Sequence, residues 1–172
     1  RNPDPTTTRD LYLPRHGQAD PHTGALTEQG RRQADLLGQR LSHLAPPHST
    51  TLRHGPAQRT TQTAHLVSAH LDHLKPQPLP EAGDYAPHLP QHFELPAENA
   101  EKILEFIDHV PPRERSPELG RRALERFTGP APGERPLREV LITHAYLVSF
   151  LIAHALDAPL WRWVSTPVAN AA

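Results

Sequence analysis

The stretch LYLPRHGQ, residues 11–18, joins a short apolar run to an arginine, a histidine and a glycine. The apolar residues 11–13 predict a β-strand. Ligands of open α/β sheets bind beyond the carboxyl ends of the strands, so Arg15 and His16 predict an anion-binding site there. The glycine that follows them lets the backbone approach a ligand closely. Because the same tripeptide recurs at Arg53-His54-Gly55, its context has to decide between the two copies.

Beyond this stretch, apolar residues recur with the periods of helices and strands along most of the chain. Proline pairs and a proline-rich region over residues 76–96 separate the periodic segments, and that region predicts a long surface loop. The order of the elements favours one domain over residues 1–172, a three-layer α/β/α sandwich around a mostly parallel sheet. The expected elements after the first strand are a helix over 26–44, a strand over 50–52, helices over 58–74, 97–109 and 117–128, a strand over 139–143 and a helix over 145–156.

A second polar side chain stands at the end of a predicted strand. Residues 139–143, EVLIT, have the β-branched, apolar character of a buried strand, and His144 follows them. The next residues predict an apolar helix, which places His144 at a helix N-terminus, where backbone N–H groups favour anions. Two strands are therefore expected to bring their terminal histidines to one edge of the sheet.

Composition narrows the class of protein. A chain of 172 residues with a formal net charge of −1, 36% hydrophobic and 22% charged residues predicts a soluble globular domain without a nucleic-acid partner. The absence of cysteine excludes disulfides and cysteine nucleophiles. No apolar run is long enough to cross a bilayer and residues 1–10 lack a signal-peptide core, so we expect no membrane partner and a cytoplasmic location.

Three separated motifs resemble the histidine phosphatase superfamily, the phosphoglycerate mutase-like enzymes. They are the strand that ends in Arg15-His16-Gly17, the helical segment PAQRTTQTA over residues 56–64, and the strand LITH over residues 141–144. The segment LTEQGRRQA over residues 26–34 also resembles the helix that follows the first motif in that family. The resemblance implies a phosphoglycerate mutase-like fold, and it makes the second copy, at residues 53–55, a coincidence.

The resemblance implies a role for each motif. His16 would attack phosphorus and become a phosphohistidine, a covalent step that needs its neutral imidazole. Arg15, Arg59 and His144 would donate hydrogen bonds to the phosphoryl oxygens, since such transfer needs a fixed positive cradle. The same positions of the family add two further phosphate-binding residues, Gln18 and Ala145.

The family takes the proton for the leaving group from a carboxylic acid in a loop that reads L-x-E. The nearest match here is LPEAG over residues 79–83, so the resemblance assigns the acid to Glu81. Its spacing to glycine departs from the family pattern, and Asp84 lies close by as the substitute. We expect Tyr85, His88 and His92, which follow in the same loop, to be exposed to solvent.

These features predict a metal-independent phosphomonoesterase, similar to histidine acid phosphatases, that needs no cofactor and acts on a phosphorylated small molecule or a phosphoprotein. Three alternatives stay open: a phosphotransferase of the mutase type, a catalytically silent phosphate-binding module, and a histidine-rich metal carrier. We expect no metal site, because the chain lacks cysteine and the H-E-x-x-H pattern. Histidines 65, 70 and 73 are expected on a solvated helix face, and Asn170 where relatives often continue into a last strand.

Overall fold

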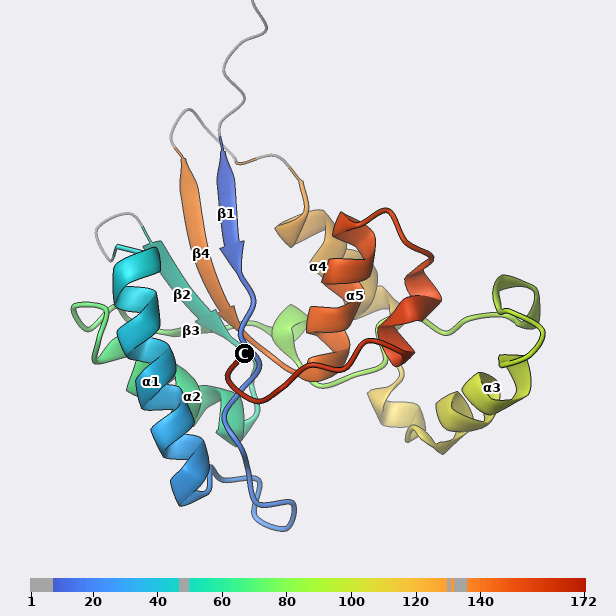
Figure 1. Ribbon diagram of the computed structural model, residues 1–172, viewed down its shortest axis with the longest axis horizontal. Helices are drawn as coiled ribbons and strands as arrows, with labels where there is room; N and C mark the ends of the chain where they lie inside the picture. The colour runs from blue at the N-terminus through green and yellow to red at the C-terminus, as the bar shows by residue number, and fades with distance from the viewer. Residues whose placement is uncertain (1–7, 47–49, 130, 132–135) are drawn as a thin grey trace, which may run out of the picture.

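The computed structural model describes residues 8–46, 50–129, 131 and 136–172. Within them, the centre of the fold is a parallel sheet whose strands lie in the order β1-β4-β2-β3. Figure 1 shows β1 and β4 side by side, with their carboxyl ends pointing the same way. The strands are β1 (Arg9–Tyr12), β2 (Thr50–His54), β3 (Gln77–Pro78) and β4 (Leu137–Ile142).

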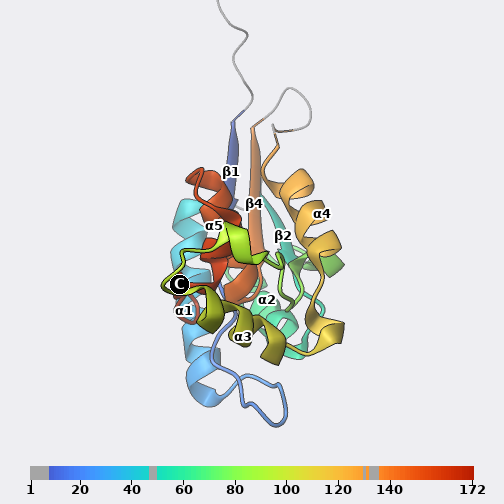
Figure 2. The same ribbon diagram turned by 90° about the vertical axis from the view of Figure 1, so that its right-hand side faces the viewer.

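Helices cover both faces of this sheet. One face carries α1 (Glu28–Leu44) and α2 (Gln58–Ser68), and the opposite face carries α4 (Pro117–Phe127) and α5 (Ala145–Ala155) (Figures 1 and 2). The helix α3 (Ala100–His109) lies outside these layers and packs on the 3-10 helix η5 (Leu160–Val164). The shorter 3-10 helices are η2 (Pro80–Ala82), η3 (His92–Glu94) and η4 (Pro112–Glu114).

The side chains of β4 explain the three layers. Successive side chains of a strand point to opposite faces. Val140 and Ile142 are buried against α1 and α2, whereas Leu141 is buried in the larger core beneath α4 and α5. Because both faces are covered, the whole end of this strand is apolar. The structure confirms the predicted α/β sandwich, and its parallel sheet runs through the middle.

Helix α2 is shorter than the predicted 58–74. It ends at Ser68, and Asp72 and His73 then adopt φ angles of 49° and 55°. Residues other than glycine rarely adopt these left-handed φ angles, and a right-handed helix cannot continue through them, so the chain turns there. Leu71 is nevertheless fully buried in the same core, which explains why the apolar period continues past the end of the helix.

The expected exposure of Tyr85 is wrong. Its ring is buried in the core between the loop and α4, and its hydroxyl donates to the carbonyl of Glu81 at 2.7 Å. A buried phenol needs such a partner, and the loop itself supplies it. Of its companions, His92 is exposed and His88 is half-buried beside Glu94.

Candidate active site

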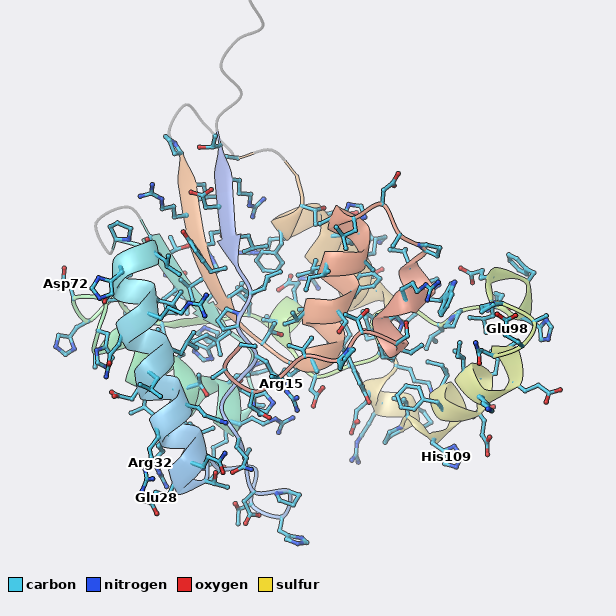
Figure 3. All side chains as sticks on the ribbon, viewed as in Figure 1. Arg15, Glu28, Arg32, Asp72, Glu98 and His109 are labelled. Atoms are coloured by element: carbon cyan, nitrogen blue, oxygen red, sulfur yellow. The ribbon has the colours of Figure 1, made fainter. Side chains whose placement is uncertain are left out.

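The carboxyl ends of β1 and β4 bring the two histidine motifs together. The pairing of these strands continues beyond their ends through a parallel bridge between Arg15 and Thr143. The amide of His16 donates to the carbonyl of Thr143 at 3.0 Å. Figure 3 shows Arg15 just beyond these strand ends. His16 and His144 consequently lie with their ring centroids 5.0 Å apart, although 128 positions separate them in sequence.

Gly17 permits a close contact between the first motif and α1. A Cβ atom at this position would lie 2.3 Å from the carbonyl oxygen of Gly30, which no side chain tolerates. The amide of Gly17 donates to the Thr63 hydroxyl of α2 at 3.1 Å. The loop that carries His16 is therefore held between both helices of one layer.

The hydrogen bonds of the His16 ring define which nitrogen is free. The ring is 6% exposed, and its Nδ1 lies 2.7 Å from the carbonyl oxygen of Gly17. A carbonyl only accepts, so Nδ1 carries the proton and Nε2 of the neutral ring keeps its lone pair. Burial lowers the pKa of His16, opposed by that backbone hydrogen bond and reinforced by the charges of Arg59 and Arg15. The imidazole is thus neutral at pH 7, the state that a nucleophile requires.

Two guanidinium groups flank this ring. Nη1 of Arg15 donates to the carbonyl of Val168 at 2.7 Å, and its buried Nε has no hydrogen-bond partner among the described residues. Arg59 stands in the first turn of α2, and its Nη2 donates to Asp84 Oδ2 at 2.6 Å. Both keep donors for an anion, and guanidinium groups suit phosphoryl oxygens because they bond in pairs.

The His144 ring is almost completely buried, with 2% of its surface exposed. Neither ring nitrogen has a hydrogen-bond partner within the part of the chain that the structure describes, and Nδ1 lies 3.5 Å from Asp84 Oδ2. Burial lowers the pKa of His144 to about 3, against the attraction of Asp84. Buried polar groups without partners are rare in folded proteins, so this neutral ring is suited to bond an incoming ligand.

A cavity of about 380 Å³ opens over these groups. Four of the predicted phosphate-binding residues line it: Arg15, His16, Gln18 and Arg59. His144 is not among the lining residues, but its ring lies directly behind two of them, His16 and Asp84. Ala145 lies instead in an adjacent cavity that shares Arg15 with this one. The complete lining of the first cavity is Arg15, His16, Gln18, Ala19, Asp20, Pro21, Gly24, Arg59, Asp84 and Asn170.

The structure does not bring Glu81 into this cavity. Its side chain is 6% exposed and forms an ion pair with Arg122 of α4. Of the two acids in this loop, Asp84 is the one that lines the cavity, and its carboxylate lies between Arg59 and His144. Glycine at the end of β2 allows this arrangement, because a Cβ at Gly55 would lie 2.2 Å from the carbonyl oxygen of Ala82. The second tripeptide thus has a packing role at its glycine, and His54 does not line the cavity.

Asn170 is a cavity residue that the sequence motifs do not identify. It lies in an irregular segment, not in a last strand, and its Nδ2 donates to the carbonyl of His16 at 3.1 Å. No local pattern marks it, because the contact joins residues 154 positions apart. Only the path of the C-terminal segment, which crosses the strand ends in Figure 1, explains its place.

The described residues hold no cluster of three or more histidines and carboxylates that suits a metal ion. Among the same residues, none of the helices has the length and apolar character needed to cross a membrane.

The fold and this cavity define a class: an α/β sandwich with a cavity lined by Arg15, His16 and Arg59 at the carboxyl ends of a parallel sheet. The chain belongs to branch 1 of the histidine phosphatase superfamily, whose family model matches residues 11–172. The resemblance drawn from the three motifs is confirmed.

Among named relatives, the serine/threonine-protein phosphatase Pgam5, mitochondrial, of Caenorhabditis elegans is 30% identical over 170 residues. Its counterpart in Caenorhabditis briggsae is 25% identical over 180 residues. Each match includes 96% of this chain, but the chain spans only 56% of the length of either relative.

Solved structures share the fold. A putative alpha-ribazole-5'-P phosphatase from Escherichia coli gives a TM-score of 0.63 at 20% identity and covers 96% of this chain and 88% of its own. A phosphoglycerate mutase from Plasmodium falciparum gives 0.60 at 18% identity, over 92% of this chain and 76% of its own. At these identities the comparison establishes the fold alone.

Proposed function

We propose that this chain is a phosphomonoester hydrolase that acts through a phosphohistidine on His16. The observation that carries the proposal is the free Nε2 lone pair of a buried, neutral His16, which lies in one cavity with Arg15 and Arg59. Phosphoryl transfer needs such an in-line nucleophile together with fixed positive charge for the equatorial oxygens. Both parts are present in the same cavity.

The reaction would proceed in two displacements. His16 Nε2 forms a bond to phosphorus while the bond from phosphorus to the leaving oxygen breaks, and an acid protonates that oxygen. Water then attacks phosphorus, the bond to Nε2 breaks, and the conjugate base of the acid takes the proton of the water. Arg15, Arg59 and His144 would donate hydrogen bonds to the phosphoryl oxygens in both steps. No step requires a metal ion.

Asp84 is the better candidate for the acid. It lies 2.6 Å from Arg59 and 3.5 Å from His144, whereas the carboxylate of Glu81 is occupied by Arg122. A general acid must come within hydrogen-bond reach of the oxygen that it protonates. We therefore propose the substitute that the sequence left open, Asp84, in place of Glu81.

The relatives support hydrolysis of a phosphorylated substrate. The two worm proteins are named serine/threonine-protein phosphatases, which favours transfer to water and makes a phosphoprotein one candidate substrate. A phosphorylated small molecule remains the other candidate. The mutase type and the silent phosphate-binding module are the competing functions, and both are outcomes of the test.

The test is hydrolysis of para-nitrophenyl phosphate in EDTA by the wild type, by His16→Ala and by the control His65→Ala. His65 is exposed on α2, outside the cavity. We expect activity in the wild type and the control and its loss in His16→Ala. Incubation with labelled substrate should leave an acid-labile, alkali-stable phosphoryl group on the wild type.

Each other outcome has a distinct meaning. Thermal stabilisation by inorganic phosphate without turnover would support the binding module. Transfer to an added sugar acid faster than to water would support the mutase type. Turnover that survives the loss of His16 would overturn the proposed mechanism.

A further inference from the structure

A second cavity, of about 400 Å³, lies beside the first. Arg15 lines both cavities and is the only charged residue among those described that line the second. Its guanidinium donates to the carbonyl of Val168, and Val168 also lines the second cavity. A phosphoryl group held at Arg15 would therefore lie at the border between the two spaces.

Three aromatic residues form the inner wall of this second cavity. The ring centroids of Tyr146 and Trp163 are 4.8 Å apart, and those of Phe106 and Tyr146 are 6.1 Å apart with the rings nearly perpendicular. Trp163 is 1% exposed, and its Nε1 donates to the carbonyl of His88 at 3.0 Å. Burial and this hydrogen bond hold the indole ring in place. Phe106 is 39% exposed, which leaves ring surface free for a further aromatic group.

Tyr146 connects this wall to the candidate active site. It follows His144 by two positions, in the first turn of α5. Burial raises the pKa of Tyr146, with added contributions from the charges of Asp84 and Glu114 and an opposing one from Arg15. The phenol thus lies within the electrostatic field of two groups of the first cavity.

We propose that this aromatic cavity receives the leaving group of the substrate and makes the enzyme selective for phosphomonoesters of aromatic alcohols. The inference rests on the proposed phosphatase function. Oriented aromatic pairs add affinity beyond the burial of apolar area, and a flat uncharged ring matches a wall of Phe106 and Tyr146. A small alkyl leaving group would leave most of the cavity unfilled.

The experiment compares kcat/KM for phenyl phosphate and 2-naphthyl phosphate with kcat/KM for ethyl phosphate and phosphoserine. Aryl esters react faster intrinsically, so only the change in the aryl-to-alkyl ratio between variants is informative. We expect Phe106→Ala to lower that ratio about tenfold, since it removes one stacking surface. Phe106→Leu, which keeps apolar bulk and guards against a folding defect, should lower the ratio as well.

Phe93→Ala is the matched control, because Phe93 is 87% exposed and does not line the cavity. Its aryl-to-alkyl ratio should equal that of the wild type. If the wild type hydrolyses both classes and neither Phe106 variant changes the ratio, the inference fails and the proposed function stands. If the wild type hydrolyses neither class, the proposed function fails and the inference falls with it.

Comparing a phosphotyrosine peptide with phenyl phosphate tests whether the aromatic cavity accepts an aryl ester carried by a protein or a small one. Hydrolysis that depends on Phe106 with either substrate supports the aromatic site. An aryl-to-alkyl ratio that is the same in the wild type and in both Phe106 variants, with either aryl substrate, would overturn it.

Discussion

At the level of single residues, Glu81 and Asp84 differ most clearly in what surrounds their carboxylates. They stand three positions apart, yet one carboxylate is buried against Arg122 and the other lies between Arg59 and His144. Local sequence does not separate them, because both are acids in one proline-rich loop. The direction that each side chain takes follows from what packs around it: η2 turns Glu81 toward α4, and the following residues turn Asp84 toward the cavity.

Asp84→Asn and Glu81→Gln form a matched pair. We expect Asp84→Asn to lower kcat for an alkyl phosphate by about 10²–10⁴, the usual contribution of a general acid. The loss should be smaller for para-nitrophenyl phosphate, whose leaving group needs little protonation. Steady-state kinetics with both esters measures this difference.

Glu81→Gln should instead act on stability. It weakens the ion pair between the buried carboxylate of Glu81 and the half-exposed Arg122, and it should lower the free energy of unfolding by about 1–3 kcal/mol, measured by urea titration. A larger loss of kcat in Glu81→Gln than in Asp84→Asn would return the acid role to Glu81.

Among elements, the C-terminal segment over residues 165–172 contributes more to the candidate site than its lack of regular structure suggests. Asn170 donates to the carbonyl of His16, and the amide of Ala171 donates to the carbonyl of Arg15. Ser149 of α5 donates to the carbonyl of Thr166 and ties the segment to the helix. The segment thus holds the backbone of the first motif, and Ala171 packs against the core beneath α1 and α2.

Asn170→Ala tests this positioning role. Loss of one hydrogen bond to the backbone of His16 corresponds to about 1 kcal/mol, so we expect kcat to fall about fivefold with little change in KM. Asn170→Asp removes the donor while it keeps the shape, and it should not restore the rate. The control is Asn99→Ala, at an exposed position before α3 whose side chain makes no capping bond. An equal rate in wild type and Asn170→Ala would show that the contact is dispensable.

For the whole molecule, the strand order β1-β4-β2-β3 places the first and last described strands side by side. This pairing buries His144 and His16 beneath one cavity, and burial lowers the pKa of both imidazoles. Stability is therefore coupled to pH through groups that the fold keeps neutral.

We expect the free energy of unfolding to decrease as the pH falls below 6.5. Between 6.5 and about 3, the unfolded chain protonates the imidazole of His144 while the folded state does not, so protons favour unfolding. One such group contributes at most about 1.4 kcal/mol per pH unit. Urea titrations at pH 7.5, 6.0 and 5.0 measure the slope, and His144→Gln should have a smaller one. Identical slopes in the two proteins would contradict the assignment.

Much of the architecture could be predicted because its signals are local. The apolar period, which is visible within a few neighbouring residues, predicts a strand at 11–13, where the structure has β1 at Arg9–Tyr12. It also predicts the buried strand near residue 140 and most of the helices. The apolar period does not reveal the end of α2, because Leu71 stays buried after the helix has stopped. The sequence does not reveal the burial of Tyr85 either, because a buried phenol depends on a hydrogen-bond partner that the fold supplies.

Local sequence is enough to specify the alternation of strands and helices, and it places Arg15, His16, Arg59 and His144 at the ends of these elements. Those features depend on backbone periodicity and on residue type, which neighbouring residues specify. Long-range packing, in contrast, sets which of the two loop acids, Glu81 or Asp84, lines the cavity. It also brings Asn170 to His16 and gathers Phe106, Tyr146 and Trp163 into one wall. Each of these contacts joins segments far apart in the chain, and their meeting depends on how the layers pack.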